Sequence, residues 1–429
     1  MALVACGAAR ADDWPCFMGP THDGVSAETN LVAGWPESGP PLVWKMQVGA
    51  SYSAPSVTKD AMFLFHRIRN EEVLECLDAA TGAPRWRAAY PTDYVDRYGY
   101  NGGPRCTPLV TSEHVFTFGA AGKFCCFNTK TGAVAWQRQL NEELSVPQNF
   151  FGVGSSPLLE GRLLIVNAGG PNGAGIVALD RDTGKTVWQS TDEGASYASP
   201  MCATIGGQRY AFIFGRGGLV VLDPANGKLF WRFPFRSKLY ESVNAASPVI
   251  AGDCVFVSAS YHTGGALLRM HKDERGSGSG FLAWVKSFWT RQNEQPKGYD
   301  VLWKDEVMSN HWATSILRDG YLYGFNGRHE EGTTLRCVEL ATGKLMWEQP
   351  KLTRCSMIYA NGHFIVLTEW GRLMLARLTP KGCEIISTAQ VLEPQRPSYI
   401  APVLANGFLY VRNERQLFCL DIRANRKKD

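Results

Sequence analysis

One eleven-residue pattern recurs along this chain and constrains its fold more than any other feature. The pattern reads small-x-Asp-x-x-Thr-Gly-x-x-x-Trp and is complete at residues 178–188. Near copies end at four other tryptophans, and a divergent copy ends at a fifth: Trp86, Trp136, Trp231, Trp347 and, for the divergent copy, Trp303. A period of roughly 40–50 residues indicates a repeat architecture in which each unit packs against its neighbours.

A second signal precedes each copy and divides each unit into strands. A small residue followed by Pro, or a close variant, stands at 53–55, 106–108, 155–157, 198–200, 246–248 and 400–402. An apolar segment such as 163–166 comes next, and a third segment leads into the Thr-Gly turn, where Gly can adopt positive φ. The last segment ends on Trp. Four short strands in roughly 45 residues are typical of a propeller blade.

Eight such units can be counted, and the last one is incomplete. Seven begin near residues 51, 104, 154, 196, 244, 311 and 355, and the eighth begins near 398 but stops after Asp421 without its Trp strand. The segment 41–44 ends in Trp44 and precedes the first unit. The predicted fold is therefore an all-β, eight-bladed β-propeller of four-stranded blades over residues 41–429. Its ring is closed by the N-terminal strand, which removes an open sheet edge.

Composition excludes several classes of protein. The chain has 429 residues, of which 20% are charged, and a net charge of +4. This balance is too slight to predict a nucleic-acid partner. No apolar run reaches the ~18 residues that a membrane helix needs, so no transmembrane span is expected.

The N-terminal segment predicts export. Residues 1–11 look like the end of a signal peptide, because Ala9-Arg10-Ala11 fits the small-x-small cleavage pattern. Residues 3–6 also resemble a lipobox, which would make the protein a lipoprotein through Cys6. A disordered cytosolic tail is the remaining alternative. The predicted localisation is the periplasm or cell envelope, with residues 12–40 as an N-terminal extension.

The eleven-residue pattern resembles the tryptophan-docking motif of the pyrroloquinoline quinone (PQQ) propeller superfamily. The opening segment 13–24 looks more narrowly like PQQ-like propeller proteins of planctomycetes. The superfamily includes quinoprotein alcohol dehydrogenases and the lipoprotein propeller of the outer-membrane protein assembly machine. The resemblance implies the fold but leaves two functions open. The leading hypothesis is a ligand- or protein-binding scaffold module of the cell envelope. The alternative is a PQQ-dependent dehydrogenase that oxidises an alcohol or sugar, with PQQ and calcium as cofactors.

The cysteines follow the repeat rather than a disulfide framework. Four of them occupy the first position of the motif, where a buried free thiol acts as a small apolar filler: Cys76, Cys126, Cys337 and Cys419. Quinoprotein alcohol dehydrogenases often carry an adjacent-cysteine disulfide against the quinone, so the pair Cys125–Cys126 has two interpretations, core packing and cofactor contact. Asn244 and Glu369 offer oxygen ligands, but two residues do not define a calcium site.

Propeller geometry predicts where a ligand would bind. The loops that lead into each first strand and those that follow each second strand lie on one face, around the central channel. Reading these two columns selects candidate ligand-binding residues: His66, Arg67, Arg105, Tyr197, Asn244, Tyr261, His262, His311, Arg328, Glu369 and Arg412. Cationic and aromatic groups together suit an anionic or hydroxylated ligand. The alternative is that these groups bind loop carbonyls or channel water. No catalytic residue is assigned, although His66, Arg67 and His262 are the best candidates.

The fifth unit carries an insertion at residues 271–300. It contains a charged stretch, a Gly-Ser linker and the aromatic segment 281–289. This segment predicts either a contact with a partner or membrane surface, or a flap that folds back onto the propeller.

Overall fold

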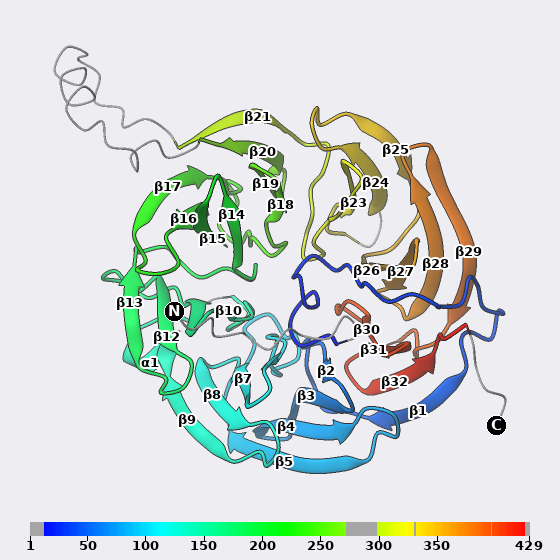
Figure 1. Ribbon diagram of the computed structural model, residues 1–429, viewed down its shortest axis with the longest axis horizontal. Helices are drawn as coiled ribbons and strands as arrows, with labels where there is room; N and C mark the ends of the chain where they lie inside the picture. Colours follow the sequence, from blue (N-terminus) through cyan, green and yellow to red (C-terminus); the bar gives the residue numbers. More distant parts are fainter. Residues whose placement is uncertain (1–12, 149, 272–297, 330–331, 396, 425–429) are drawn as a thin grey trace.

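The computed structural model describes residues 13–148, 150–271, 298–329, 332–395 and 397–424. The predicted signal-peptide remnant 1–11, with Cys6, and the aromatic segment 281–289 lie outside the described residues. The described residues form eight four-stranded antiparallel sheets, which are arranged as blades around a central axis (Figure 1). The predicted eight-bladed β-propeller is therefore confirmed.

The first four blades follow one another in chain order. Blade 1 comprises β2 (Ser56–Thr58), β3 (Ala61–Ile68), β4 (Glu71–Asp78) and β5 (Pro84–Pro91). Blade 2 comprises β6 (Leu109–Val110), β7 (His114–Phe118), β8 (Lys123–Asn128) and β9 (Val134–Gln139), followed by the single helical turn α1 (Leu140–Glu143). Blade 3 comprises β10 (Leu158–Glu160), β11 (Leu163–Asn167), β12 (Ile176–Asp180) and β13 (Thr186–Ser190). Blade 4 comprises β14 (Met201–Ile205), β15 (Gln208–Phe214), β16 (Gly218–Leu222) and β17 (Leu229–Pro234).

The last four blades continue the same order up to the closure. Blade 5 comprises β18 (Val249–Ala251), β19 (Cys254–Ala259), β20 (Gly264–Met270) and β21 (Tyr299–Asp305). Blade 6 comprises β22 (Ile316–Arg318), β23 (Tyr321–Asn326), β24 (Thr334–Glu339) and β25 (Leu345–Gln349). Blade 7 comprises β26 (Cys355–Ala360), β27 (His363–Thr368), β28 (Arg372–Thr379) and β29 (Gly382–Gln390). Blade 8 comprises β30 (Val403–Ala405), β31 (Phe408–Arg412), β32 (Gln416–Asp421) and β1 (Leu42–Gln47).

The ring closes between the two ends of the chain. Strand β1 pairs antiparallel with β32, and Trp44 lies opposite Cys419. The Trp44 ring also packs 6.0 Å from the ring of Tyr410 in β31. The N-terminal strand thus supplies the outermost strand that blade 8 lacks, as predicted, and covers the edge of β32.

The recurring Trp and Gly of the sequence pattern meet between neighbouring blades. The ring of Trp136 in blade 2 lies under the turn of blade 3, where Gly184 has φ +68 and a Cβ would stand 2.6 Å from that ring. The indole N–H of Trp136 donates to the carbonyl of Arg181 (2.9 Å). The same indole-to-carbonyl bond recurs at Trp44, Trp86, Trp188, Trp303 and Trp347. The pattern therefore encodes contacts between blades as well as turns within them.

Replacing Gly184 by Ala is expected to destabilise the fold by about 2–5 kcal/mol. The positive φ costs about 1–2 kcal/mol for a residue with a Cβ, and displacing the Trp136 ring costs about 1–3 kcal/mol more. Gly161→Ala is the matched control, because Gly161 has φ +61 but no atom within 4 Å of its Cβ position. Urea unfolding measures both free energies, and equal losses would show that the contact with Trp136 adds nothing.

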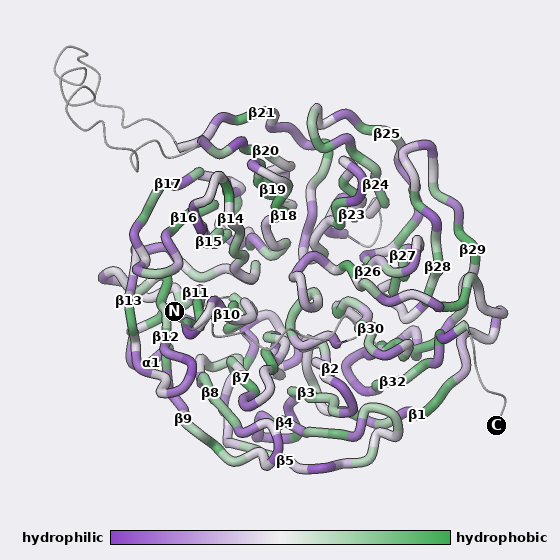
Figure 2. Tube along the Cα trace, in the orientation of Figure 1, coloured by the Kyte–Doolittle hydropathy of each residue, from purple (hydrophilic) through white to green (hydrophobic). Residues whose placement is uncertain are grey.

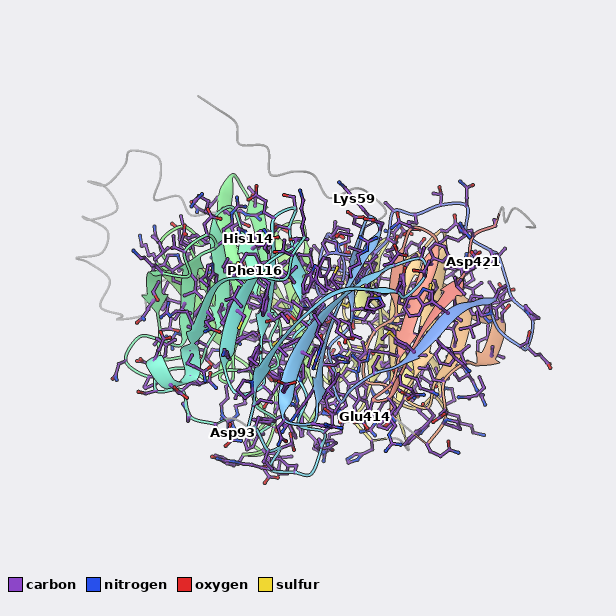
Figure 3. All side chains as sticks on the ribbon, turned by 90° about the horizontal axis from the view of Figure 1, so that it is seen from below. Lys59, Asp93, His114, Phe116, Glu414 and Asp421 are labelled. Carbon is purple, nitrogen blue, oxygen red and sulfur yellow. The ribbon has the colours of Figure 1, made fainter. Side chains whose placement is uncertain are left out.

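The loops of the propeller divide between two faces. Asp93 and Glu414 lie at one face, whereas Lys59 and His114 lie toward the opposite face (Figure 3). The first face, here named the channel face, holds the connections between blades and the loops after each second strand. The second face, the turn face, holds the Thr-Gly turns. Apolar residues gather in the strands, and the connecting loops are more hydrophilic (Figure 2).

The segment 13–26 closes the channel from the turn face. Trp14 exchanges two backbone hydrogen bonds with Val57 of blade 1 (2.7 and 2.9 Å), and the Pro15 carbonyl accepts from Val110 of blade 2 (2.8 Å). Tyr359 of blade 7 bonds to the backbone on both sides of Val25. Figure 1 shows this segment in blue across the centre of the ring. Part of the predicted extension is therefore a plug that joins three blades, a role that sequence analysis did not assign to it.

Candidate functional site

Aromatic side chains fill the channel above the plug. Tyr399 lies 5.3 Å from Tyr52 and 5.1 Å from Trp312, measured between ring centroids. Trp14 and Met18 of the plug lie below them, and the space left between the two layers is a cavity of about 60 Å³. Pockets for organic cofactors are typically ~300 Å³ or more. The channel interior is thus a packed layer that is too small for the three fused rings of PQQ.

Arg105 belongs to this layer and is paired within it. Its guanidinium bonds to the buried carboxylate of Asp96 at 2.7 Å. It also lies 5.4 Å from the centroid of Tyr52 and 5.7 Å from that of Tyr94. The ion pair and both rings hold Arg105 in place beside the channel axis.

Glu369 is fully buried and also has an internal partner. Its two carboxylate oxygens accept from Arg354, one of them from Nε at 2.8 Å. The Arg354 guanidinium lies 5.6 Å from the Trp312 ring and 5.2 Å from that of Tyr399. Sequence analysis missed Arg354 because the seventh unit has Met357 where most units have Pro. Arg354 stands three residues before Met357, as Tyr52 stands three residues before Pro55.

His311 and Tyr261 meet where blades 5 and 6 approach each other. The Tyr261 hydroxyl lies 3.1 Å from Nε2 of His311, and the Arg328 guanidinium lies 4.7 Å from the Tyr261 ring. Burial, reinforced by the charge of Arg354, lowers the pKa of His311 to about 3. His311 is therefore neutral at physiological pH. His262 beside them is exposed.

His66 and Arg67 hold loop backbone. Nδ1 of His66 accepts the backbone N–H of Gly49 (3.0 Å). Arg67 donates to the carbonyls of Tyr94 (2.6 Å) and Gly102 (3.0 Å). The His66 bond fixes the segment between β1 and blade 1, and the Arg67 bonds fix the connection between blades 1 and 2.

Three more of the predicted residues also bind loop backbone: Tyr197, Asn244 and Arg412. The Asn244 amide donates to the Gly215 carbonyl (2.9 Å), and the Tyr197 hydroxyl accepts the backbone N–H of Phe151 (2.7 Å). The buried Arg412 guanidinium donates to the carbonyls of Ser53 (3.3 Å) and Gly49 (3.1 Å). Arg412 thus ties blade 8 to blade 1. The predicted residues lie in loops or at strand ends on the channel face, but most of their polar groups bind protein atoms.

Cys125 and Cys126 lie in the third strand of blade 2, away from the channel. Cys125 packs in the apolar layer shared with blade 1, and Cys126 packs on the other side of the sheet, in the layer shared with blade 3. Both are free thiols, like the other cysteines of the described residues. Among those residues, no three His, Cys, Asp or Glu side chains are grouped so that they could hold a metal ion.

Two connections on the channel face, 92–108 and 235–248, carry exposed apolar side chains that are here named the apolar patch. It consists of Val95, Tyr98, Tyr100, Leu239 and Tyr240, and Val95 and Tyr240 are 73% and 75% exposed. Rings beneath the patch support it, since Phe151 lies 5.3 Å from Tyr98 and 5.6 Å from Tyr100. The other large apolar side chains that are exposed in the described residues all lie in outermost strands: Leu42, Val43, Val134, Val187, Leu229, Val301, Leu345 and Ile385. The patch is therefore a distinct feature of the channel face.

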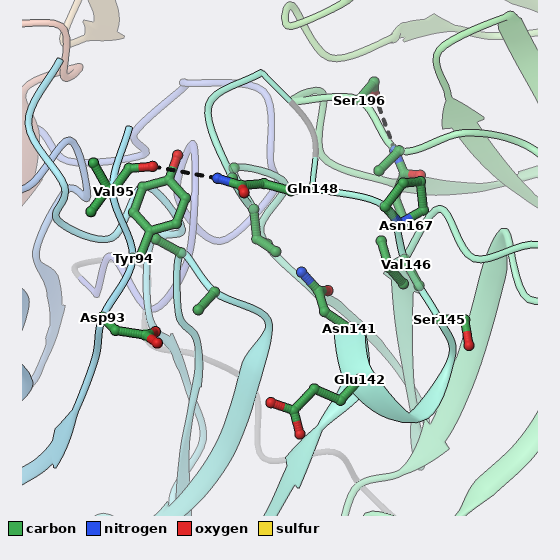
Figure 4. Close-up of a pocket in the computed structure, with 18 residues that line it drawn as sticks. Asp93, Tyr94, Val95, Asn141, Glu142, Ser145, Val146, Gln148, Asn167 and Ser196 are labelled. Atoms are coloured by element: carbon green, nitrogen blue, oxygen red, sulfur yellow. Dashed lines mark hydrogen bonds between the residues drawn. The ribbon is translucent and has the colours of Figure 1, made fainter. Parts of the chain in front are cut away.

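Two larger cavities open on the channel face, away from the axis. The first, the amide cavity, holds about 550 Å³ beside blades 2 and 3 and includes Asn141 and Asn167 in its wall (Figure 4). Gln148 reaches across it and donates to the Val95 carbonyl (3.4 Å). The second, the arginine cavity, holds about 290 Å³ and is lined by Arg97, Arg216 and Arg236 among others. None of these three arginines is among the candidate residues selected from the sequence.

A ring of eight four-stranded blades joined by indole contacts, with a plugged axis, defines a β-propeller of the PQQ-like class. The family model described as "Outer membrane protein assembly factor BamB" matches residues 69–349. The chain belongs to this family.

Two curated relatives match part of the chain. The outer membrane protein assembly factor BamB of Burkholderia pseudomallei is 24% identical over 279 residues, which cover 63% of this chain and 62% of that protein. The tetrathionate hydrolase of Acidithiobacillus ferrooxidans is 25% identical over 234 residues, which cover 51% of this chain and 44% of that enzyme. The match thus spans less than two thirds of either relative.

Solved structures share the fold at low identity. The crystal structure of BamB from Moraxella catarrhalis has a TM-score of 0.59 and 15% identity, and covers 90% of this chain and 99% of that one. The quinohemoprotein alcohol dehydrogenase from Comamonas testosteroni has a TM-score of 0.64 and 13% identity. The match covers 98% of this chain and 82% of that one. In the described part of this chain, no helix is long and apolar enough to cross a membrane.

Proposed function

We propose that this protein is an exported binding module of the cell envelope that holds a protein partner on its channel face. The observation that carries the proposal is the exposed apolar patch of the channel face. Family membership supports it, since the matching relatives include a protein named as an outer membrane protein assembly factor. Contiguous exposed apolar surface on a folded protein commonly marks an interaction site.

The chemistry of the patch suits a protein interface. Three of its five members are tyrosines, which supply large rigid contact surfaces at low entropic cost. Arg97 and Arg216 lie close to it, and Arg216 stacks over the rings of Phe150 (4.7 Å) and Tyr240 (5.4 Å). Tyr and Arg together are the residue types most enriched at interface hot spots. The remaining channel-face residues position the loops that present this patch.

A photo-crosslinking amino acid at residue 240 tests this proposal in cells of the source organism. We expect a discrete crosslinked protein product from residue 240 and none from residue 187, which is also exposed but lies in the outer strand β13. Adding Tyr98→Ser and Tyr100→Ser should reduce the product about tenfold or more, because each buried aromatic anchor is worth about 1–2 kcal/mol. Equal crosslinking at residues 187 and 240, or none at 240, would contradict the proposal.

Export and anchoring are part of the same proposal. Residues 1–11 fit the end of a signal peptide, and Cys6 fits the lipidated position of a lipobox. Cys6→Ala should move the protein from the membrane fraction to the soluble periplasm if Cys6 carries the lipid. Cleavage after Ala11 predicts no change in distribution. Residues 281–289, for which the sequence predicts a further contact with a partner, lie outside the described residues.

The alternative is a PQQ-dependent dehydrogenase that acts on an alcohol or sugar. The fold shared with a quinohemoprotein alcohol dehydrogenase is the observation in its favour. The packed layer of Tyr52, Trp312 and Tyr399 leaves about 60 Å³ at the axis, and its residues do not accommodate PQQ as they stand. Dye reduction that required added PQQ and calcium, and that fell on Glu369→Gln, would replace the binding-module proposal with this one.

A further inference from the structure

We propose that the amide cavity is a binding site for a small hydroxylated amine, the chemical class of an amino sugar. This inference goes beyond the protein-binding function proposed above and does not depend on it. The amide cavity holds about 550 Å³, which is in the usual range for small-molecule sites, whereas the cavity at the axis holds about 60 Å³. Its walls come from the connection 92–108, from α1 and the segment after it, and from loops and strand ends of blades 2 and 3.

The amide cavity carries negative charge that the protein does not neutralise. Asp93 and Glu142 line it, and their carboxylate groups are turned into the same part of the space (Figure 4). Asp93 has no ion-pair or hydrogen-bond partner within the described part of the chain. Glu142 accepts a long bond from the side-chain amide of Gln139 (3.4 Å). No lysine or arginine stands among the described lining residues, so a bound cation would supply the missing charge.

The surroundings of the amide cavity would orient such a ligand. The arginine cavity shares part of its wall with the amide cavity, including Pro147 and Gln148, and is itself lined by three arginines. An ammonium group is therefore drawn toward Asp93 and Glu142 and away from the shared wall. An anionic ligand would meet two carboxylates inside the amide cavity. The charge distribution thus selects a cation and sets its direction.

The amide groups in the wall suit a ligand with hydroxyl groups. Asn141 points into the cavity (Figure 4), and its Nδ2 atom has no hydrogen-bond partner among the described residues. Gln148 makes two long bonds that a ligand can replace: it donates to the Val95 carbonyl (3.4 Å) and accepts from Arg97 (3.3 Å). An amide both donates and accepts hydrogen bonds, and so does a hydroxyl group. A ligand with several hydroxyls can therefore pair with these side chains in either direction.

The position of Asn141 is fixed before any ligand binds. The backbone N–H of Leu140 donates to the Gly122 carbonyl (3.0 Å), and the Asn141 carbonyl accepts the N–H of Val146 (2.8 Å). The Asn141 side chain lies against Gly122, where a Cβ would stand 2.1 Å from Cγ of Asn141. The glycine thus provides the room that this side chain occupies. An immobilised donor loses little entropy when it binds a ligand.

Calorimetric titration of the full chain at pH 6 tests the inference with three ligands of similar shape: glucosamine, glucose and glucuronate. Glucosamine carries hydroxyls and, at this pH, an ammonium group, whereas glucose is neutral and glucuronate is an anion. We expect glucosamine to saturate one site, glucose to bind at least about tenfold more weakly, and glucuronate to give no saturable binding. Added salt should weaken glucosamine binding, because salt screens its attraction to the two carboxylates.

Matched variants separate the effect of charge from that of folding. Asp93→Asn and Glu142→Gln each keep the size of the side chain but remove its charge, and each should weaken glucosamine binding about tenfold. Asp93 is exposed and has no partner among the described residues, so Asp93→Asn should unfold at the same urea concentration as the parent. Glu113→Gln is the control, because Glu113 is exposed between β6 and β7 on the turn face and should leave binding unchanged.

Three results would each overturn the inference: no saturable glucosamine binding, equal affinity for glucosamine and glucose, or unchanged glucosamine affinity in the folded Asp93→Asn variant. An equal loss of affinity in Glu113→Gln and Asp93→Asn would do the same, since it would show a general attraction to acidic surface rather than a site. The crosslink at residue 240 reads the proposed protein partner and is independent of all these results.

Discussion

Deleting residues 1–48 is expected to destabilise the propeller by more than about 6 kcal/mol. The deletion removes both β1, which covers the edge of β32, and the plug that joins blades 1, 2 and 7. Three indoles that pack against the propeller, Trp14, Trp35 and Trp44, are lost with it. Removing one buried tryptophan side chain costs about 3–5 kcal/mol, and the uncovered strand edge adds a route to aggregation. Urea unfolding and size-exclusion chromatography measure the two effects.

Two shorter deletions separate the contributions. Removal of residues 1–12 keeps the contacts that Asp13 and Trp14 make with blade 1, so this variant is the reference for the two longer deletions. Removal of residues 1–40 keeps β1 but takes away the plug, and should give an intermediate loss. An unchanged unfolding free energy in the 1–48 deletion would show that neither element stabilises the ring.

Alkaline pH is expected to unfold the protein through its buried thiols. Burial raises the pKa of Cys125, Cys126 and Cys419 from the ordinary value of 9.0 to about 12. The folded state therefore keeps these protons above pH 9, whereas the unfolded state releases them. Their stabilising contribution is complete below pH 9 and is lost as the pH rises toward 12. Between pH 9 and 10, each such thiol lowers the free energy of unfolding by about 1 kcal/mol. These three thiols together therefore lower it by about 3 kcal/mol.

The buried Arg412 acts in the opposite direction. Burial lowers the pKa of Arg412 from 12.5 to about 9, so above pH 9 the unfolded state binds more protons at this site, and stability rises. A single guanidinium offsets only part of the loss from several thiols. Urea unfolding at pH 8, 9 and 10 should give a steadily falling free energy. The double variant Cys126→Ala and Cys419→Ala should fall less steeply, and equal free energies at pH 8 and 10 in the parent would contradict this account.

The repeat made the fold predictable, because a period that recurs eight times leaves few alternatives. The docking of Trp136 under Gly184 and the closure through Trp44 both follow from that period. The plug was not predictable in the same way, because residues 13–26 occur once and no repeated position reveals what they cover. Periodicity therefore predicts the ring, but not the segments that the ring encloses.

The candidate site was predictable only as a set of loops. The two columns placed His66, Arg67 and Arg412 on the channel face, but buried loop backbone needs donors and acceptors, and these side chains supply them. The apolar patch and the arginine cavity depend on how irregular connections such as 92–108 and 235–248 fold over the face. Loop conformation is not periodic, so Arg236 and Tyr240 carried no signal in the sequence.

The pairing of Trp44 with Cys419 also sets the order in which the protein is completed. Strand β1 is among the first segments to leave the ribosome, and its partner β32 is among the last. Throughout synthesis the chain carries an unpaired outer strand at one end and a growing stack of blades at the other. Such a distant contact is slow to form, because the loop between the two strands must first be brought to order. Only a chain that extends through β32 can therefore close the ring. A product truncated before residue 416 has no strand with which β1 can pair.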